Sequence, residues 1–128
     1  MESAIRWLKI SYIVGVVVDG LAGILMVIPS RMGETEFRYA MGLGAALMFG
    51  WTVLLLWANM RPLERKGVLL ITIFPVITGL FLTGIWAAGS GFFPVEKIIP
   101  VSMLQVLLVL LFSFSYLKAR SAEKQNLR

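Results

Sequence analysis

The sequence predicts an all-α integral membrane protein, an antiparallel bundle of four transmembrane helices forming a single domain. Of its 128 residues, 59% are hydrophobic and only 15% are charged, whereas about a quarter of the residues in a soluble domain are charged. The charges gather between four apolar runs, at residues 10–28, 39–60, 67–88 and 98–117. Each run is long enough to cross a hydrocarbon core about 30 Å thick. The segments between the runs are too short to fold separately.

We expect helices at about residues 5–28, 37–60, 67–88 and 97–118. Short connections make successive helices antiparallel, in an up-down-up-down order. Pro75 predicts a kink in the third helix, because proline has no backbone N–H to donate. A segment with two glycines and a proline, residues 89–94, ends that helix.

The basic residues predict the orientation of the helices. Nine lysines and arginines lie in the two terminal segments and the second loop, against three in the other two loops. Under the positive-inside rule, both termini are then cytoplasmic and the chain is a multi-pass protein of the cytoplasmic (inner) cell membrane. We interpret the net charge of +5 as topology signals and contacts with lipid headgroups, and expect no nucleic acid partner. The polar segment after Leu117 is expected to fray into water.

Several kinds of chemistry are excluded by composition. The chain has no cysteine and no histidine, which removes thiol redox chemistry, thiolate or imidazole metal ligation, and histidine-ligated haem. Six of the seven carboxylates lie in loops or terminal segments, with no spacing that suggests convergence on a metal ion. We therefore expect no metal, no cofactor and no catalytic residue.

Small residues at every fourth position predict where the helices pack, because close backbone approach drives association within lipid. The first helix carries Gly15 and Gly23 on either side of Asp19. Similar stripes in the second and third helices are Gly42, Ala46 and Gly50, and Gly79, Thr83 and Ala87. Trp51, near the middle of the second helix, needs a partner within the bundle for its indole N–H.

Asp19 is the only ionisable residue deep within a predicted span. It lies nine residues before Ile28, or roughly 13 Å below the outer interface. A charge at that depth costs a few kcal/mol, so this residue should face the interior and be paired or neutral. Tyr12 lies on the same face of the helix.

Three further polar residues lie in the outer half of the bundle. Gln105 and Thr83 are expected within roughly 6 Å of Asp19 in depth, and Arg38 stands at the outer mouth of the second helix. One interpretation is a polar pocket that is open to the outside and takes a ligand or carries a proton. The other is a protonated Asp19 that holds helices together through a hydrogen bond to Gln105 or to a backbone carbonyl.

Two segments carry a resemblance to a known family. A glycine-rich first helix ends at a proline in Leu21-Ala-Gly-Ile-Leu-Met-Val-Ile-Pro29, and an acidic–aromatic–arginine entry opens the second in Glu36-Phe-Arg-Tyr-Ala-Met-Gly-Leu-Gly44. Together these segments resemble the small four-helix DoxX-like membrane proteins and their uncharacterised relatives. The resemblance implies an antiparallel four-helix bundle, with some members associated with quinone- or sulfur-linked membrane oxidoreductases. It makes Glu36 and Arg38 candidate site residues.

A second comparison is with the small multidrug resistance transporters, which are four-helix chains with an essential acid in the first helix. Asp19 is similar to that acid in kind and position. Those proteins have a glutamate there, and the aromatic residues around it are missing here apart from Tyr12.

The sequence favours a non-enzymatic binding or accessory module of the membrane, with a polar pocket in its outer half. Its expected partners are the lipid bilayer, a small amphipathic ligand or lipid, and a second copy or another membrane subunit. The alternative is a proton-coupled small-molecule transporter acting as a homodimer. An enzyme is not expected, because no nucleophile–base pair is evident. The candidate ligand-binding residues are Asp19, Tyr12, Glu36, Arg38, Thr83 and Gln105.

Overall fold

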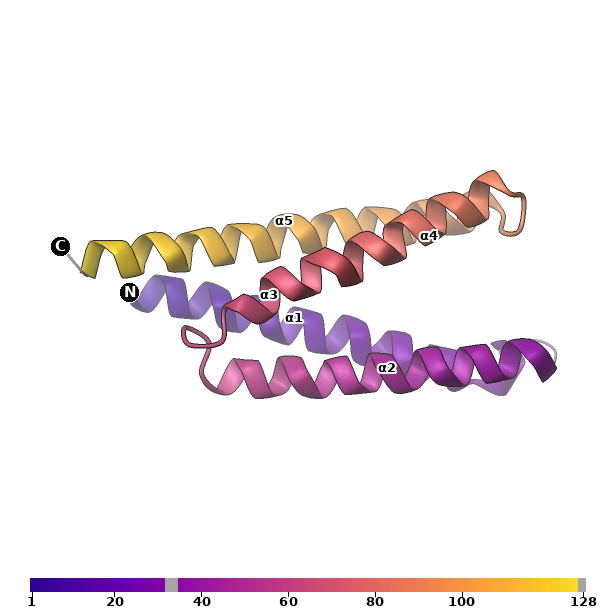
Figure 1. Cartoon of the computed structure of the whole chain (residues 1–128), viewed down its shortest axis with the longest axis horizontal. Helices are drawn as coiled ribbons and strands as arrows, with labels where there is room; N and C mark the ends of the chain where they lie inside the picture. Colours follow the sequence, from indigo (N-terminus) through magenta and orange to yellow (C-terminus); the bar gives the residue numbers. More distant parts are fainter. Residues whose placement is uncertain (32–34, 127–128) are drawn as a thin grey trace.

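The computed structural model describes residues 1–31 and 35–126, and every regular element in these ranges is helical (Figure 1). Its elements are α1 (Glu2–Val27), η1 (Pro29–Arg31), α2 (Thr35–Met60), α3 (Gly67–Ile71), η2 (Thr72–Ile77), α4 (Thr78–Gly89) and α5 (Val95–Asn126).

Four stretches are long and apolar enough to cross a membrane: α1, residues 37–60 of α2, the run from α3 to α4, and residues 95–125 of α5. Their bounds agree with the expected helices to within three residues, except at the end of α5. The prediction of an all-helical chain with four potential spans is therefore confirmed.

The C-terminal segment differs from the expectation that it frays. α5 continues to Asn126 as a helix, because its inner face keeps contacts with the rest of the chain. Ala119 is fully buried, and Lys66 Nζ donates a 2.7 Å hydrogen bond to Glu123 Oε1 within an ion pair. The polar residues that suggested fraying, such as Arg120 and Lys124, lie on the exposed face of this helix.

The predicted kink at Pro75 is present in the third span. The π-helical segment η2 joins α3 to α4, and Phe74 in it has non-helical dihedral angles of φ −134° and ψ 117°. The neighbouring threonines satisfy carbonyls there: the Thr78 hydroxyl donates to the Ile73 carbonyl at 2.9 Å, and the Thr72 hydroxyl to the Val68 carbonyl at 2.7 Å.

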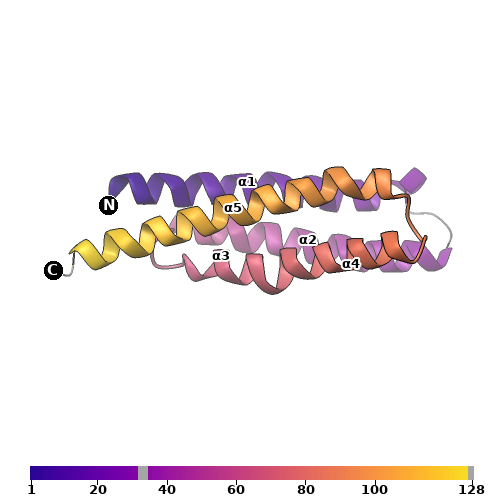
Figure 2. The ribbon, with the colours of Figure 1, turned by 90° about the horizontal axis from the view of Figure 1, so that it is seen from above.

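Both termini lie at one end of the molecule, together with the loop at residues 61–66 (Figures 1 and 2). We call this the terminal end, and the opposite end the distal end. α1 packs chiefly on α2 and also on α5, while α3 and α4 pack on α5. We refer to α1 and α2 as the N-terminal half, and to α3, η2, α4 and α5 as the C-terminal half.

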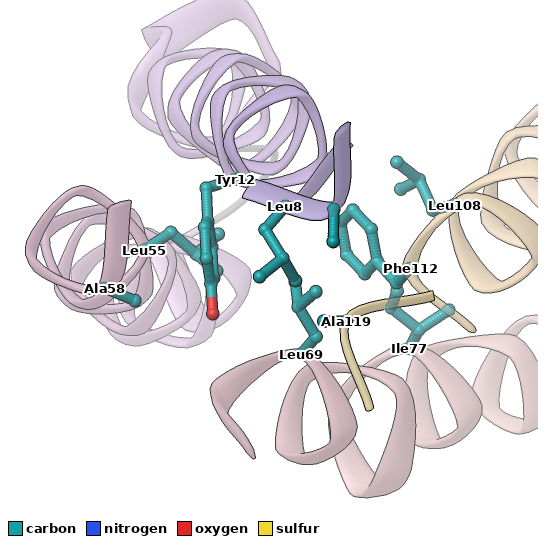
Figure 3. Close-up of a cluster of buried hydrophobic side chains, with 10 residues drawn as sticks. Leu8, Tyr12, Leu55, Ala58, Leu69, Ile77, Leu108, Phe112 and Ala119 are labelled. Carbon is teal, nitrogen blue, oxygen red and sulfur yellow. The ribbon is translucent and has the colours of Figure 1, made fainter. Parts of the chain in front are cut away.

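The core lies toward the terminal end, where the two halves meet. In Figure 3, Tyr12 of α1 lies toward Leu55 of α2, and Leu8 points toward Leu69 of α3. Phe112 of α5 completes this cluster and is 1% exposed. The core also includes Ala4, Ala58, Ile77, Leu108 and Ala119.

Toward the distal end the halves diverge (Figure 1). α4 buries none of its residues, and Ala45 is the only buried residue in the described part of α2 before Leu55. At the distal tip, the rings of Phe37 and Phe92 approach to 6.2 Å between centroids and link the halves. Between the terminal core and this aromatic contact, the two halves therefore pack loosely against each other.

Only one of the three predicted small-residue stripes forms a packed interface. A Cβ added at Gly15 would lie 2.9 Å from Leu55 Cδ1, and one at Gly23 would lie 2.8 Å from Phe49 Cε1. By contrast, a Cβ at Gly42 or Gly50 would meet nothing within 4 Å.

The predictions for the second and third helices were wrong. Ala46 is exposed, as are Gly79 and Thr83 of the third span. α2 instead turns the face with Ala45 and Leu55 inward, and its bulky Phe49 fills the space left by a glycine of α1. Small residues therefore serve on both helices: Gly15 and Gly23 of α1 face Leu55 and Phe49, while Gly44 of α2 faces Met26 of α1, whose Cε leaves no room for an added Cβ.

Candidate functional site

Asp19 lies on the packed face of α1 at the point where the bundle opens. It stands one turn from Gly15 and one turn from Gly23, both buried. The side chain is itself half-buried. No hydrogen bond or ion pair reaches it from residues 1–31 or 35–126. In the described part of the chain, this half-buried carboxyl group thus has no hydrogen-bond or ion-pair partner.

Tyr12 shares this face but belongs to the terminal core. Its side chain is fully buried, and its hydroxyl donates a 2.8 Å hydrogen bond to the Arg65 carbonyl. Seven residues separate it from Asp19, which corresponds to roughly 10 Å along the helix. The structure gives it a role in fixing the 61–66 loop, away from Asp19.

Gln105 of α5 lies at a depth similar to that of Asp19. The close approach of Gly15 to Phe112 sets the register between α1 and α5. Counted from that contact toward the distal end, Asp19 lies roughly 6 Å away and Gln105 roughly 10 Å away. No hydrogen bond joins these two side chains within the described residues.

A small hollow adjoins Gln105. It has a volume of about 170 Å³ and lies between α5 and the η2–α4 segment. Thr78 and Phe81 also line it, and the rest of the lining is aliphatic. The glutamine is half-buried there, so this hollow offers one amide group to an otherwise apolar occupant.

The other predicted site residues are spread apart. Thr83 is exposed on α4, and its hydroxyl donates to the Gly79 carbonyl at 2.9 Å within the same helix. Arg38 is exposed near the start of α2, at the distal end. Glu36 falls in the first turn of α2, and its side chain lies outside the described residues. The structure brings Asp19 and Gln105 to a common depth but does not bring all six residues together.

Sequence reasoning missed a polar junction at the terminal end. The Arg65 guanidinium lies 3.5 Å from the centre of the Trp57 ring and donates to the Trp57 carbonyl. The carbonyl of the same arginine accepts from Tyr12, and the next residue, Lys66, pairs with Glu123. This junction ties the 61–66 loop to α1, α2 and α5. The only signal in the sequence was the cluster of charges in the loop.

The described residues contain no group of three or more histidine, cysteine, aspartate or glutamate side chains placed to hold a metal ion.

Comparisons with known proteins identify no relative: no protein-family model, no curated protein and no solved structure matches this chain.

Proposed function

We propose that the chain is a multi-pass protein of the cytoplasmic membrane, with four antiparallel spans in up-down-up-down order and both termini in the cytoplasm. Its four long apolar helices support membrane insertion. Gly15 of α1 approaches Leu55 of α2, and the later Gly23 approaches the earlier Phe49. The two helices therefore run in opposite directions at this contact, which supports the antiparallel order. The excess of basic residues at the terminal end supports its placement in the cytoplasm.

Within that membrane, we propose a non-enzymatic binding or accessory module that takes a small amphipathic molecule in its distal half. The observation that carries this proposal is Asp19, a half-buried carboxyl group without a partner among the described residues. A polar group in lipid is costly unless it is paired. α4 and the described first half of α2 bury almost none of their residues, which supports a partner from outside the chain in this half of the molecule.

The ligand's chemistry follows from what surrounds the carboxyl group. An ionised carboxylate accepts hydrogen bonds and attracts cations, and the neighbouring helix faces are apolar. The occupant should therefore combine a cationic or hydrogen-bond-donating head with an apolar body. The DoxX-like resemblance is part of this proposal, because it implies a four-helix bundle of which some members are associated with quinone- or sulfur-linked membrane oxidoreductases.

A direct test uses tetraphenylphosphonium, an apolar cation, as the probe. Equilibrium dialysis of the detergent-purified protein should detect binding, and Asp19→Asn should weaken it by about tenfold, because the charge attraction is lost. Glu2→Gln is the matched control, since it removes an exposed carboxylate at the start of α1, away from Asp19. Equal binding by the parent and by Asp19→Asn would overturn the proposal.

A second measurement separates a binding module from a transporter. Proteoliposomes with an imposed pH gradient should bind the probe without accumulating it or releasing protons. Proton-coupled accumulation that Asp19→Asn abolishes would replace the binding module with a transporter.

A further inference from the structure

At the terminal end, a hollow of about 260 Å³ opens between the start of α1 and the 61–66 loop. Its polar lining consists of Lys9, Arg61 and Glu64. Its apolar lining includes Ile5, Met60 and Leu63. The hollow thus combines charged groups with an apolar wall, as a site for an amphipathic molecule requires.

The charges in this hollow do not cancel. Arg61 pairs with Glu64 at 3.3 Å, and both side chains are about two-thirds exposed, at 65% and 67%. Lys9 has no acidic partner in the described part of the chain. One positive charge is therefore uncompensated. The Arg61–Glu64 pair is weak because water screens it, so Arg61 can exchange its carboxylate for a stronger acceptor.

The neighbouring basic residues of the loop are engaged elsewhere. Arg65 stacks on Trp57, and Lys66 pairs with Glu123. This leaves Lys9 and Arg61 as the cations directed to the hollow. Arginine binds phosphate oxygens in a bidentate manner, and lysine adds a point charge.

We propose that this hollow binds the headgroup of an anionic phospholipid with a singly charged phosphodiester, such as phosphatidylglycerol. Lys9 and Arg61 hold the phosphate, and the apolar wall receives the glycerol backbone and the start of the acyl chains. Met60, which is 77% exposed at the end of α2, contacts the chains where they enter the bilayer. The excess of one positive charge matches the single negative charge of the lipid.

The test measures lipid binding to the full chain in a neutral detergent by native mass spectrometry. Dioctanoyl phosphatidylglycerol should bind about tenfold more tightly than dioctanoyl phosphatidylcholine. The double variant Lys9→Gln/Arg61→Gln should lose that preference. Arg120→Gln/Lys124→Gln is the matched control, because it removes the same charge from exposed positions of α5 and should keep the preference.

Glu64→Gln tests the same site in the opposite direction. Because this change frees Arg61, it should tighten phosphatidylglycerol binding by roughly threefold. This gain keeps the proposal testable if the double variant folds poorly. Glycerophosphoglycerol, the same headgroup without chains, should bind far more weakly.

Four outcomes would overturn the site. Equal loss in both double variants would show diffuse surface charge, and equal binding of phosphatidylcholine would show an apolar hollow only. Equal binding of glycerophosphoglycerol would show a site for a free phosphate ester. Unchanged binding in Glu64→Gln would remove Arg61 from the site.

Discussion

The indole N–H of Trp51 donates a 3.1 Å hydrogen bond to the hydroxyl of Thr72, which joins α2 to η2 midway along the bundle. The same hydroxyl donates to the Val68 carbonyl, so one threonine serves as both donor and acceptor. The expectation that this tryptophan needs a partner inside the bundle is confirmed. The bond is one of few specific polar links between the two halves.

Trp51→Phe should lower the free energy of unfolding by about 1 kcal/mol, because it removes this hydrogen bond and leaves an aromatic ring in place. Unfolding in detergent, followed by circular dichroism, measures the change. A double-mutant cycle with Thr72→Val should give a coupling of about 0.6 kcal/mol, typical of such bonds in membranes. A coupling of zero would mean that the bond adds nothing to stability.

Tyr12→Phe should destabilise the protein by about 1 kcal/mol, because it removes the hydrogen bond from the Tyr12 hydroxyl to the Arg65 carbonyl and leaves that carbonyl with the Val68 N–H alone. Tyr39→Phe is the control, since that side chain is 74% exposed and should tolerate the change. Hydrogen exchange should also quicken in the 61–66 loop of Tyr12→Phe alone. Equal free energies of unfolding for the two variants would show that the Tyr12 hydroxyl does not stabilise the 61–66 loop.

Gly15→Ala should lower the free energy of unfolding, whereas Gly50→Ala should leave it unchanged or raise it. At Gly15 the new methyl group would lie 2.9 Å from Leu55 Cδ1 and 3.2 Å from Phe112 Cζ, and both side chains are almost fully buried. Overpacking should cost about 1–2 kcal/mol. At Gly50 nothing lies within 4 Å, so alanine should be neutral or stabilise the helix by about 0.5 kcal/mol. Thermal unfolding of both variants in one detergent measures the contrast, and equal melting temperatures would contradict it.

The same pair of positions shows why the fold was predictable and the packing was not. Hydropathy located the four helices that are long and apolar enough to cross a membrane, because each forms one long apolar run. It could not tell an inward face from an outward one, because lipid and protein neighbours are equally apolar. Gly15 and Gly50 sit in similar four-residue patterns, yet only Gly15 is packed. Which stripe is buried depends on the bulk of the residues opposite, such as Phe49.

The sequence predicted how deep the candidate site residues lie along their helices, but not whether their side chains point toward one another. Counting residues placed Asp19 and Gln105 at similar depths, and the register of α1 and α5 retains this. Whether side chains converge depends on how far the helices diverge. The two halves approach closely at the terminal core, where the hydroxyl of Ser11 donates to that of Ser115 at 2.7 Å. Two serines 104 residues apart give no signal in a single sequence.

The Asp19→Leu variant distinguishes two roles of this carboxyl group: binding a ligand, or holding helices together through a hydrogen bond within the chain. In the structure, no described residue bonds to this carboxyl group, so leucine leaves no partner unsatisfied and removes a polar group from an apolar region. The free energy of unfolding in detergent should therefore stay the same or rise by about 1–2 kcal/mol. Asp19→Asn should also fold normally, because it keeps the size of the side chain. A loss of more than about 1 kcal/mol in the leucine variant alone would show that Asp19 is bonded within the chain. Its polar group would then stabilise the bundle, and the distal binding site would lose its basis.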